Sequence, residues 1–85
     1  MINKVWLSGY LTNIVEFDTK EFAVLDTENE KYYIYWDKDK YENIHEMVDR
    51  YIIVEGVLAR IMLKHNKKIT RTLAIEVRRI EIYDI

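Results

Sequence analysis

The stretch Lys4-Val5-Trp6-Leu7-Ser8-Gly9-Tyr10-Leu11 alternates between two kinds of side chain. Its odd-numbered positions are apolar or glycine, whereas its even-numbered positions are lysine, tryptophan, serine and tyrosine. Successive side chains of a β-strand point to opposite faces, so this alternation predicts a half-buried strand. We expect the odd-numbered side to face a core, which leaves Trp6 and Tyr10 on the outer side.

The same period of two recurs along the chain and predicts four more strands. We expect these strands at residues 22–25, 31–36, 51–63 and 69–83. Polar residues 27–29 would join the second and third strands as a hairpin, because such residues are typical of tight turns.

The last of these runs changes phase along its length. Apolar residues from Leu73 to Val77 keep one phase, whereas Ile80 and Ile82 keep the other. One inserted residue changes which side chains face the core, so we predict a one-residue β-bulge near residues 78 and 79.

Between the third and fourth strands the period becomes helical. Tyr41, Ile44 and Val48 recur at the spacing of one helix face, and Asp39 with Glu42 resembles a capping box. One short helix is therefore expected between residues 37 and 50.

The order of elements is three strands, a helix and two long strands. Five such strands bury one apolar face most completely when they close on themselves, which removes the sheet edges. The fold class we predict is all-β with one short helix: a five-stranded Greek-key barrel of the OB-fold type, with the helix plugging one end. Gly56 falls where a strongly coiled barrel strand needs a close backbone approach.

The length and composition restrict the chain to one small domain without cysteine chemistry. Its 85 residues include no cysteine, no proline and two glycines, which allows a single domain over residues 1–85. Without cysteine there is no disulfide scaffold, thiolate zinc site or cysteine nucleophile, and the usage fits the reducing cytoplasm. No apolar run is long enough to span a membrane, so no membrane association is expected.

Catalytic patterns are lacking, and we expect a protein that is not an enzyme. Ser8 is the only serine, and no histidine lies near it in the sequence to activate it. The segment His45-Glu46-Met47-Val48-Asp49 misses the second histidine of the H-E-x-x-H zinc motif. We therefore expect no metal and no cofactor.

Two segments resemble bacterial single-stranded DNA-binding proteins. The first twelve residues, MINKVWLSGYLT, are similar to the M-I-N-x-V-x-L-x-G-x-L-T of that family's first strand. Residues 54–58, VEGVL, resemble the V-E-G-x-L of its fourth strand. The resemblance covers essentially the whole chain, and it implies an OB-fold that binds single-stranded DNA with little sequence preference.

The chain also departs from that family. Its second hairpin is shortened around Asn29, and Glu30 and Leu63 stand at positions where the family carries base-stacking aromatic residues. With these elements reduced, the chain resembles the small primosomal relatives of that family. Aligned with the family, strand 31–36 turns Tyr32, Ile34 and Trp36 outward, so the resemblance implies that Trp36 and Tyr32 stack on bases.

Alternation places Tyr33 and Tyr35 on the other face of this strand. We expect these two side chains to fill the core, because aromatic residues favour strands and pack well there.

The charge is unevenly distributed. The formal net charge is -2, but residues 1–50 carry six basic and eleven acidic side chains, whereas residues 51–85 carry seven basic and four acidic. A basic loop at residues 64–68 joins the last two strands, where OB-folds commonly contact a nucleic-acid backbone. The phosphate contacts we predict are Arg60, Lys64, Lys67, Lys68 and Arg71. Lysine at a solvated hairpin tip also protects a sheet edge from aggregation, which is the alternative interpretation.

The first strand predicts self-association. A tryptophan exposed on a strand is typical of an interface, and in the resembling family first strands pair across a homodimer. This resemblance implies a homodimer with Lys4, Trp6 and Ser8 at the interface. For Tyr10 a nucleic-acid role stays open.

A second functional class remains compatible with the sequence. The missing stacking positions, the shortened hairpin and the acidic helix region favour an OB-fold that binds proteins of a replication or mobile-element complex and no longer binds nucleic acid. RNA is a further possible ligand, because nothing in the sequence distinguishes a 2′-hydroxyl.

Overall fold

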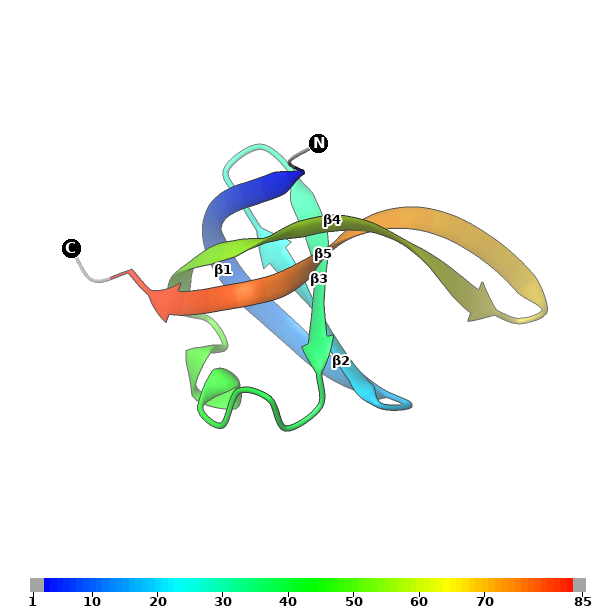
Figure 1. The fold of residues 1–85 in the computed structure, drawn as a ribbon, viewed down its shortest axis with the longest axis horizontal. Helices are drawn as coiled ribbons and strands as arrows, with labels where there is room; N and C mark the ends of the chain where they lie inside the picture. The colour runs from blue at the N-terminus through cyan, green and yellow to red at the C-terminus, as the bar shows by residue number, and fades with distance from the viewer. Residues whose placement is uncertain (1–2, 84–85) are drawn as a thin grey trace.

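Four antiparallel pairings and one parallel pairing between strands close the chain into a barrel in this computed structural model (Figure 1). The structure describes residues 3–83, without the side chains of Leu63 and His65. The strands follow the order β1-β2-β3-β5-β4 around the barrel, and β4 pairs with β1 to close it. Only β3 and β5 pair in parallel. Their bounds are β1 (Lys4–Phe17), β2 (Lys20–Asp26), β3 (Lys31–Asp37), β4 (Tyr51–His65) and β5 (Lys68–Ile82).

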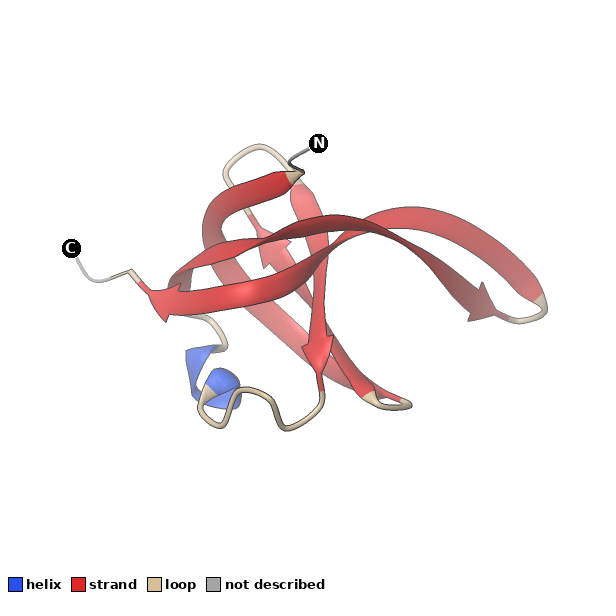
Figure 2. Ribbon diagram, in the orientation of Figure 1, coloured by secondary structure: helices blue, strands red, loops and turns tan. Residues whose placement is uncertain are grey.

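This topology is that of the predicted OB-fold, and strands dominate the ribbon (Figure 2). The predicted phase of β1 is confirmed, because Gly9 and Leu11 are buried while Trp6 and Tyr10 are exposed. The core is aliphatic apart from one tryptophan. Its fully buried large side chains are Leu11, Leu25, Ile34, Trp36, Ile44, Ile52, Val54, Ile75 and Val77.

Two β-bulges shape the barrel. The predicted bulge of the last strand is confirmed, because Glu55 pairs with Arg79 while Gly56 pairs with Val77, which leaves Arg78 as the extra residue. The second bulge lies in β1 between Thr12 and Val15 and was not predicted. β1 therefore runs past the expected Leu11 to Phe17.

The hairpin of β4 and β5 extends beyond the barrel. Among the described strands, β4 after Val57 pairs with β5 alone, and β5 before Ala74 pairs with β4 alone; Leu58 still exchanges hydrogen bonds with Asn3. We call this part, residues 58–73, the arm; it projects to the right in Figure 1. Asn66 and Lys67 form its two-residue turn with positive φ at both positions, as a type I′ hairpin requires.

The predicted helix is reduced to a single 3-10 turn, η1 (Ile44–Met47). Positive φ values at Asp39 and Asp49 interrupt helical backbone on both sides. The predicted capping box is wrong, because the residue before η1 is Asn43 and no side chain caps this turn. Helical spacing nevertheless identified the apolar side chains correctly: Ile44 is buried, and Tyr41 and Val48 pack against the core at the end of the barrel.

In the described part of the chain no helix is long and apolar enough to cross a membrane.

Gly56 lies where the backbone of β5 comes close to β4. A Cβ atom there would lie 2.3 Å from the Glu76 carbonyl oxygen and 2.6 Å from Cγ2 of Ile75. Contacts this short require the backbone to move, so the predicted close approach at Gly56 is confirmed.

We expect Gly56→Ala to lower the free energy of unfolding by about 1 to 3 kcal/mol, because the added methyl group meets backbone that cannot move independently of the sheet. Urea denaturation followed by tryptophan fluorescence measures this loss. Thr70→Ala, at an exposed position of β5, is the control and should change stability by less than about 0.5 kcal/mol. Equal stability of Gly56→Ala and the wild type would contradict the packing argument.

Candidate nucleic-acid interface

The outer side of β2 and β3 carries a cluster of aromatic side chains. Phe22 pairs with Tyr35 across the two strands, and Val24 pairs with Tyr33. The rings of Phe22 and Tyr35 stack with centroids 5.5 Å apart and planes 26° apart, and Tyr33 is 45% exposed. We call Phe22, Val24, Tyr33 and Tyr35 the aromatic face. Flat, accessible rings of this kind suit the faces of nucleobases.

Tyr35 is held in place from β5. Its hydroxyl donates a hydrogen bond of 3.4 Å to Oε2 of Glu76, whose other oxygen lies 3.2 Å from Arg78. Partial burial, followed by the neighbouring Glu76 charge, raises the pKa of Tyr35 above its ordinary value. The phenol therefore stays neutral at physiological pH and keeps its donor.

The bulge in β1 adds two apolar side chains to this surface. Before the bulge the odd-numbered residues face the core; after it, Val15 and Phe17 point outward, because one extra residue exchanges the two faces of a strand. Asn13 supplies the required positive φ of 47°. Ile14 then packs against the core in their place.

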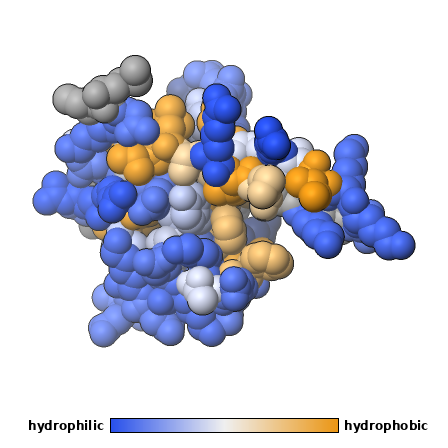
Figure 3. Space-filling view, turned by 45° about the vertical axis from the view of Figure 1, so that its right-hand side comes forward, coloured by the Kyte–Doolittle hydropathy of each residue, from blue (hydrophilic) through white to orange (hydrophobic). Residues whose placement is uncertain are grey.

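A hollow of about 230 Å³ lies where the aromatic face meets the arm. Figure 3 shows apolar surface passing from the barrel onto the base of the arm. Val15 and Phe17 are 59% and 67% exposed beside it, and Met62 of the arm is 69% exposed. The hollow is lined by Val15, Phe17, Phe22, Met62 and Lys64.

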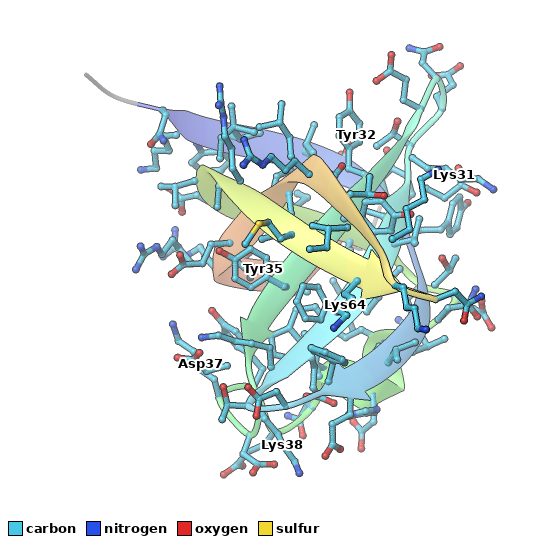
Figure 4. The ribbon with its side chains drawn as sticks, turned by 90° about the vertical axis from the view of Figure 1, so that its right-hand side faces the viewer. Lys31, Tyr32, Tyr35, Asp37, Lys38 and Lys64 are labelled. Atoms are coloured by element: carbon cyan, nitrogen blue, oxygen red, sulfur yellow. The ribbon has the colours of Figure 1, made fainter. Side chains whose placement is uncertain are left out.

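Three of the predicted phosphate contacts share one side of the arm. Cross-strand pairing sets Met62 against Arg71, and alternation places Arg60 and Lys64 on the same side as Met62. Lys64 extends from the arm over the sheet, on the side of the molecule that carries Tyr35 (Figure 4). The structure therefore brings Arg60, Lys64 and Arg71 to the side of the arm that borders the hollow.

The other two predicted cations are separated from this group. Lys67 lies in the turn at the tip of the arm, and Lys68 pairs with His65, which puts it on the opposite side from Lys64. Within the described residues, none of the five cations forms a salt bridge, so all five remain available to an anionic ligand or partner.

The prediction that Tyr32, Ile34 and Trp36 face outward is wrong. Trp36 is 1% exposed, and its Nε1 donates a hydrogen bond of 3.0 Å to Oε1 of Glu21. Glu21 is itself buried and its second oxygen lies 2.7 Å from Nε2 of His45. This contact ties η1 to the barrel, and Trp36 has no free face on which a base could stack.

Tyr32 also belongs to the inner side of β3. It is half-buried and packs against the core, and a hydrogen bond from its hydroxyl to Glu30 raises the pKa of Tyr32. Glu30 is exposed in the turn after β2, whereas the side chain of Leu63 lies outside the described residues. The aromatic side chains on the outer side of β3 are instead Tyr33 and Tyr35, which we expected in the core.

A signal for the correct phase was present in the sequence. Ile34 has no polar atom, whereas Tyr33 and Tyr35 each carry a hydroxyl that water can satisfy. Burying Ile34 necessarily buries Trp36, two positions along the strand. For Val15 and Phe17 the signal was weaker, since only the tolerance of asparagine for positive φ hinted at a bulge.

The three predicted interface residues lie exposed on the outer side of β1. Lys4 forms an ion pair with Glu55, and its Nζ lies 5.8 Å from the centre of the Trp6 ring. Ser8 accepts a hydrogen bond of 3.0 Å from the Tyr51 hydroxyl. Among the described strands, β4 alone pairs with the segment Lys4–Gly9 of β1. The other edge of this segment has no described strand beside it and is open.

Glu21 and His45 are in contact, but in the described part of the chain no group of three or more acidic or histidine side chains is arranged to hold a metal ion.

No protein-family model and no curated protein matches this sequence. Solved structures with the same fold do match. A small single-stranded DNA-binding protein from Mycoplasma pneumoniae is 20% identical with a TM-score of 0.73, covering 95% of this chain and 93% of that one. Rim1, a mitochondrial single-stranded DNA-binding protein from S. cerevisiae, is 14% identical with a TM-score of 0.68, covering 94% and 91%.

The same fold occurs in a protein of a different kind. Asparaginyl-tRNA synthetase from Pyrococcus horikoshii is 18% identical with a TM-score of 0.67, covering 93% of this chain but only 18% of the synthetase. At these identities the comparisons establish the OB-fold, and the function has to be argued from the surface.

Proposed function

We propose that this chain is a non-catalytic protein that binds single-stranded DNA with little sequence preference. The observation that carries the proposal is the exposed aromatic face beneath an arm whose cations form no salt bridges within the described residues. Bases would stack on Tyr33, Tyr35 and Phe22, while Arg60, Lys64 and Arg71 would follow the phosphates. Two single-stranded DNA-binding proteins share this fold, which supports the proposal.

Stacking on this surface needs no sequence readout. Every base offers a π-face, and each stacked base contributes about 1 to 3 kcal/mol. Phe17 and the hollow beside it extend the apolar surface toward the end of β1. Lys67 and Lys68, at the tip of the arm, would add phosphate contacts only for a strand long enough to reach them.

A protein-binding role is the second candidate. The hollow is lined by four apolar side chains and a single cation, and a hydrophobic surface of this kind suits an apolar side chain of a protein. One structure with this fold, 11% identical with a TM-score of 0.65 over 96% of this chain and 94% of that one, is an OBody bound to hen egg-white lysozyme. In this second role the chain would bind a protein of a replication or mobile-element complex through the hollow and would not bind nucleic acid.

We expect Tyr33→Ala to weaken binding of a fluorescent oligo-dT, short enough to hold a single protein, by about 5-fold to 150-fold, the equivalent of one lost stacked base. Tyr83→Ala is the matched control, because Tyr83 is also 45% exposed but lies at the end of β5, away from the aromatic face. Fluorescence anisotropy measures both affinities. Equal losses for the two variants, or no binding by the wild type at low salt, would reject this surface as the DNA site.

An RNA oligomer of matched sequence serves as competitor in the same assay. Displacement of DNA by equal amounts of RNA would extend the proposal to RNA, and displacement by DNA alone would restrict it.

Replacing Arg60, Lys64 and Arg71 together by glutamine should make the salt dependence of binding shallower by about two units in the slope of log K against log salt, because each phosphate contact on a single strand contributes about 0.7. Titrations at several salt concentrations measure the slope. Lys40→Gln, on the connection between β3 and η1, should leave it unchanged. An unchanged slope in the triple variant would remove the arm from the binding site.

We further propose a homodimer through the open edge of β1, with Lys4, Trp6 and Ser8 at the interface. Trp6 is 60% exposed, which is unfavourable for a large apolar side chain in an isolated monomer. Trp6→Glu should convert the dimer to a monomer, because it buries a charge at the contact. Sedimentation velocity measures the mass, and a dimer that persists in Trp6→Glu would place the contact elsewhere.

A further inference from the structure

A row of tyrosines crosses the outer face of the barrel on β1, β4 and β5. Tyr10 pairs with Tyr51, and the Tyr83 amide donates a hydrogen bond of 2.9 Å to the Tyr51 carbonyl. The rings meet edge to face, with centroid distances of 5.1 Å between Tyr10 and Tyr51 and 5.9 Å between Tyr51 and Tyr83. We call these three residues the tyrosine row. All three side chains are exposed, and the proposed function uses none of them.

Two carboxylates border the tyrosine row. Asp26 pairs directly with Tyr10 on the other side of β1, and a hollow of about 410 Å³ is lined by Tyr10, Asp26, Thr27, Glu28 and Tyr51. Neither Asp26 nor Glu28 forms a salt bridge within the described residues. Aromatic faces beside unpaired carboxylates favour a cation, since ring and carboxylate attract it together.

The cations that fit this site occur in the same chain. The tip of the arm presents Lys67 and Lys68. Lys67 lies in the turn and Lys68 on the side of the arm opposite Lys64, so both are separated from the side that borders the hollow beside the aromatic face. The tyrosine row lies where β4 begins and β5 ends, whereas the tip lies at the other end of these two strands. In Figure 1 these regions lie toward opposite ends of the longest dimension, which is 43 Å.

We propose that the tyrosine row and its two carboxylates bind the arm tip of a second copy of this chain, head to tail. The occupant follows from charge complementarity, because the N-terminal 50 residues carry a formal charge of -5 and the remainder +3. A contact between two different surfaces is heterologous, and it extends into an open chain wherever successive rotations do not close a ring. With its two surfaces at opposite ends of the molecule, this contact would join protomers, or the dimers proposed at β1, into longer species.

Such a contact is weak in free solution and effective on DNA. Exposed cation–π contacts and ion pairs each contribute little, and salt screens them. Two copies bound to one DNA strand, however, face each other at a high effective concentration, so the same contact then produces cooperative binding. This last step rests on the proposed function, whereas self-association without DNA does not.

Charge-reversal variants test the contact without DNA. The tip variant carries Lys67→Glu and Lys68→Glu, and the row variant carries Asp26→Lys and Glu28→Lys. Sedimentation velocity at about 10 to 300 μM protein in low salt should show wild-type mass growing with concentration beyond that of the dimer proposed at β1, and about tenfold more salt should reverse this further growth. Each variant alone should lose the growth beyond the dimer.

The decisive measurements restore the complementary charges in two ways. A single chain that carries all four changes has an acidic tip and a basic row, so it should associate like the wild type. A mixture of the tip variant and the row variant should form larger species than either alone, because the unaltered tip of the row variant can bind the unaltered row of the tip variant. Lys38→Glu with Lys40→Glu makes the net charge more negative by the same amount as the tip variant and should leave association intact. Unchanged association of the tip or row variant, or a wild type that does not grow with concentration, would overturn the proposal.

Binding to DNA supplies an independent readout. Neutral Asp26→Asn with Glu28→Gln should leave the affinity for an oligomer that holds one protein within about threefold, because neither residue belongs to the proposed DNA surface, but should abolish cooperativity on a long strand. Absence of short-oligomer binding by the wild type would reject the proposed function and leave the DNA-free association untouched. Cooperativity that survives in this neutral variant would reject the head-to-tail contact alone.

Discussion

Closure of the barrel depends on three residue pairs. Within the described residues, β3 is joined to β5 by the pairs Tyr33 with Ala74, Ile34 with Ile75 and Tyr35 with Glu76. They form the single parallel seam of an otherwise antiparallel barrel, and parallel pairing is slightly less stable per residue. The buried Ile34 and Ile75 side chains support this seam from inside. The two tyrosines on its outer side belong to the aromatic face, so barrel closure and the proposed ligand surface share the same residues.

Much of the fold could be predicted because alternation is a local property. The interior phase of β1, the hairpin of β2 and β3, the bulge at Arg78 and the close approach at Gly56 all follow from side-chain pattern and size. The end of β1 and the length of η1 did not follow. Both depend on single residues with positive φ, such as Asn13 and Asp39, and side-chain periodicity does not report backbone conformation.

The aromatic site shows a different limit. Alternation correctly divided Tyr32 to Trp36 into two faces, but the choice between them came from alignment with a family rather than from burial. The indole of Trp36 donates a hydrogen bond to the buried carboxylate of Glu21. A glutamate is ordinarily expected at the surface, so the sequence did not suggest this partner. The partner lies on a neighbouring strand, and no local pattern in the sequence connects the two. The cations of the arm were easier to identify, because unpaired lysines and arginines at a hairpin stand out without knowledge of the core.

The arm also bears on the order in which the chain folds. Its strands meet across a two-residue turn, so their pairing closes a very short loop and costs little chain entropy. The pairing of β1 with β4 joins residues as distant as Lys4 and Val57, and that loop-closure cost must be met before the core is complete. We therefore expect the hairpin to form early, so that the barrel assembles on a ribbon whose free end already exists.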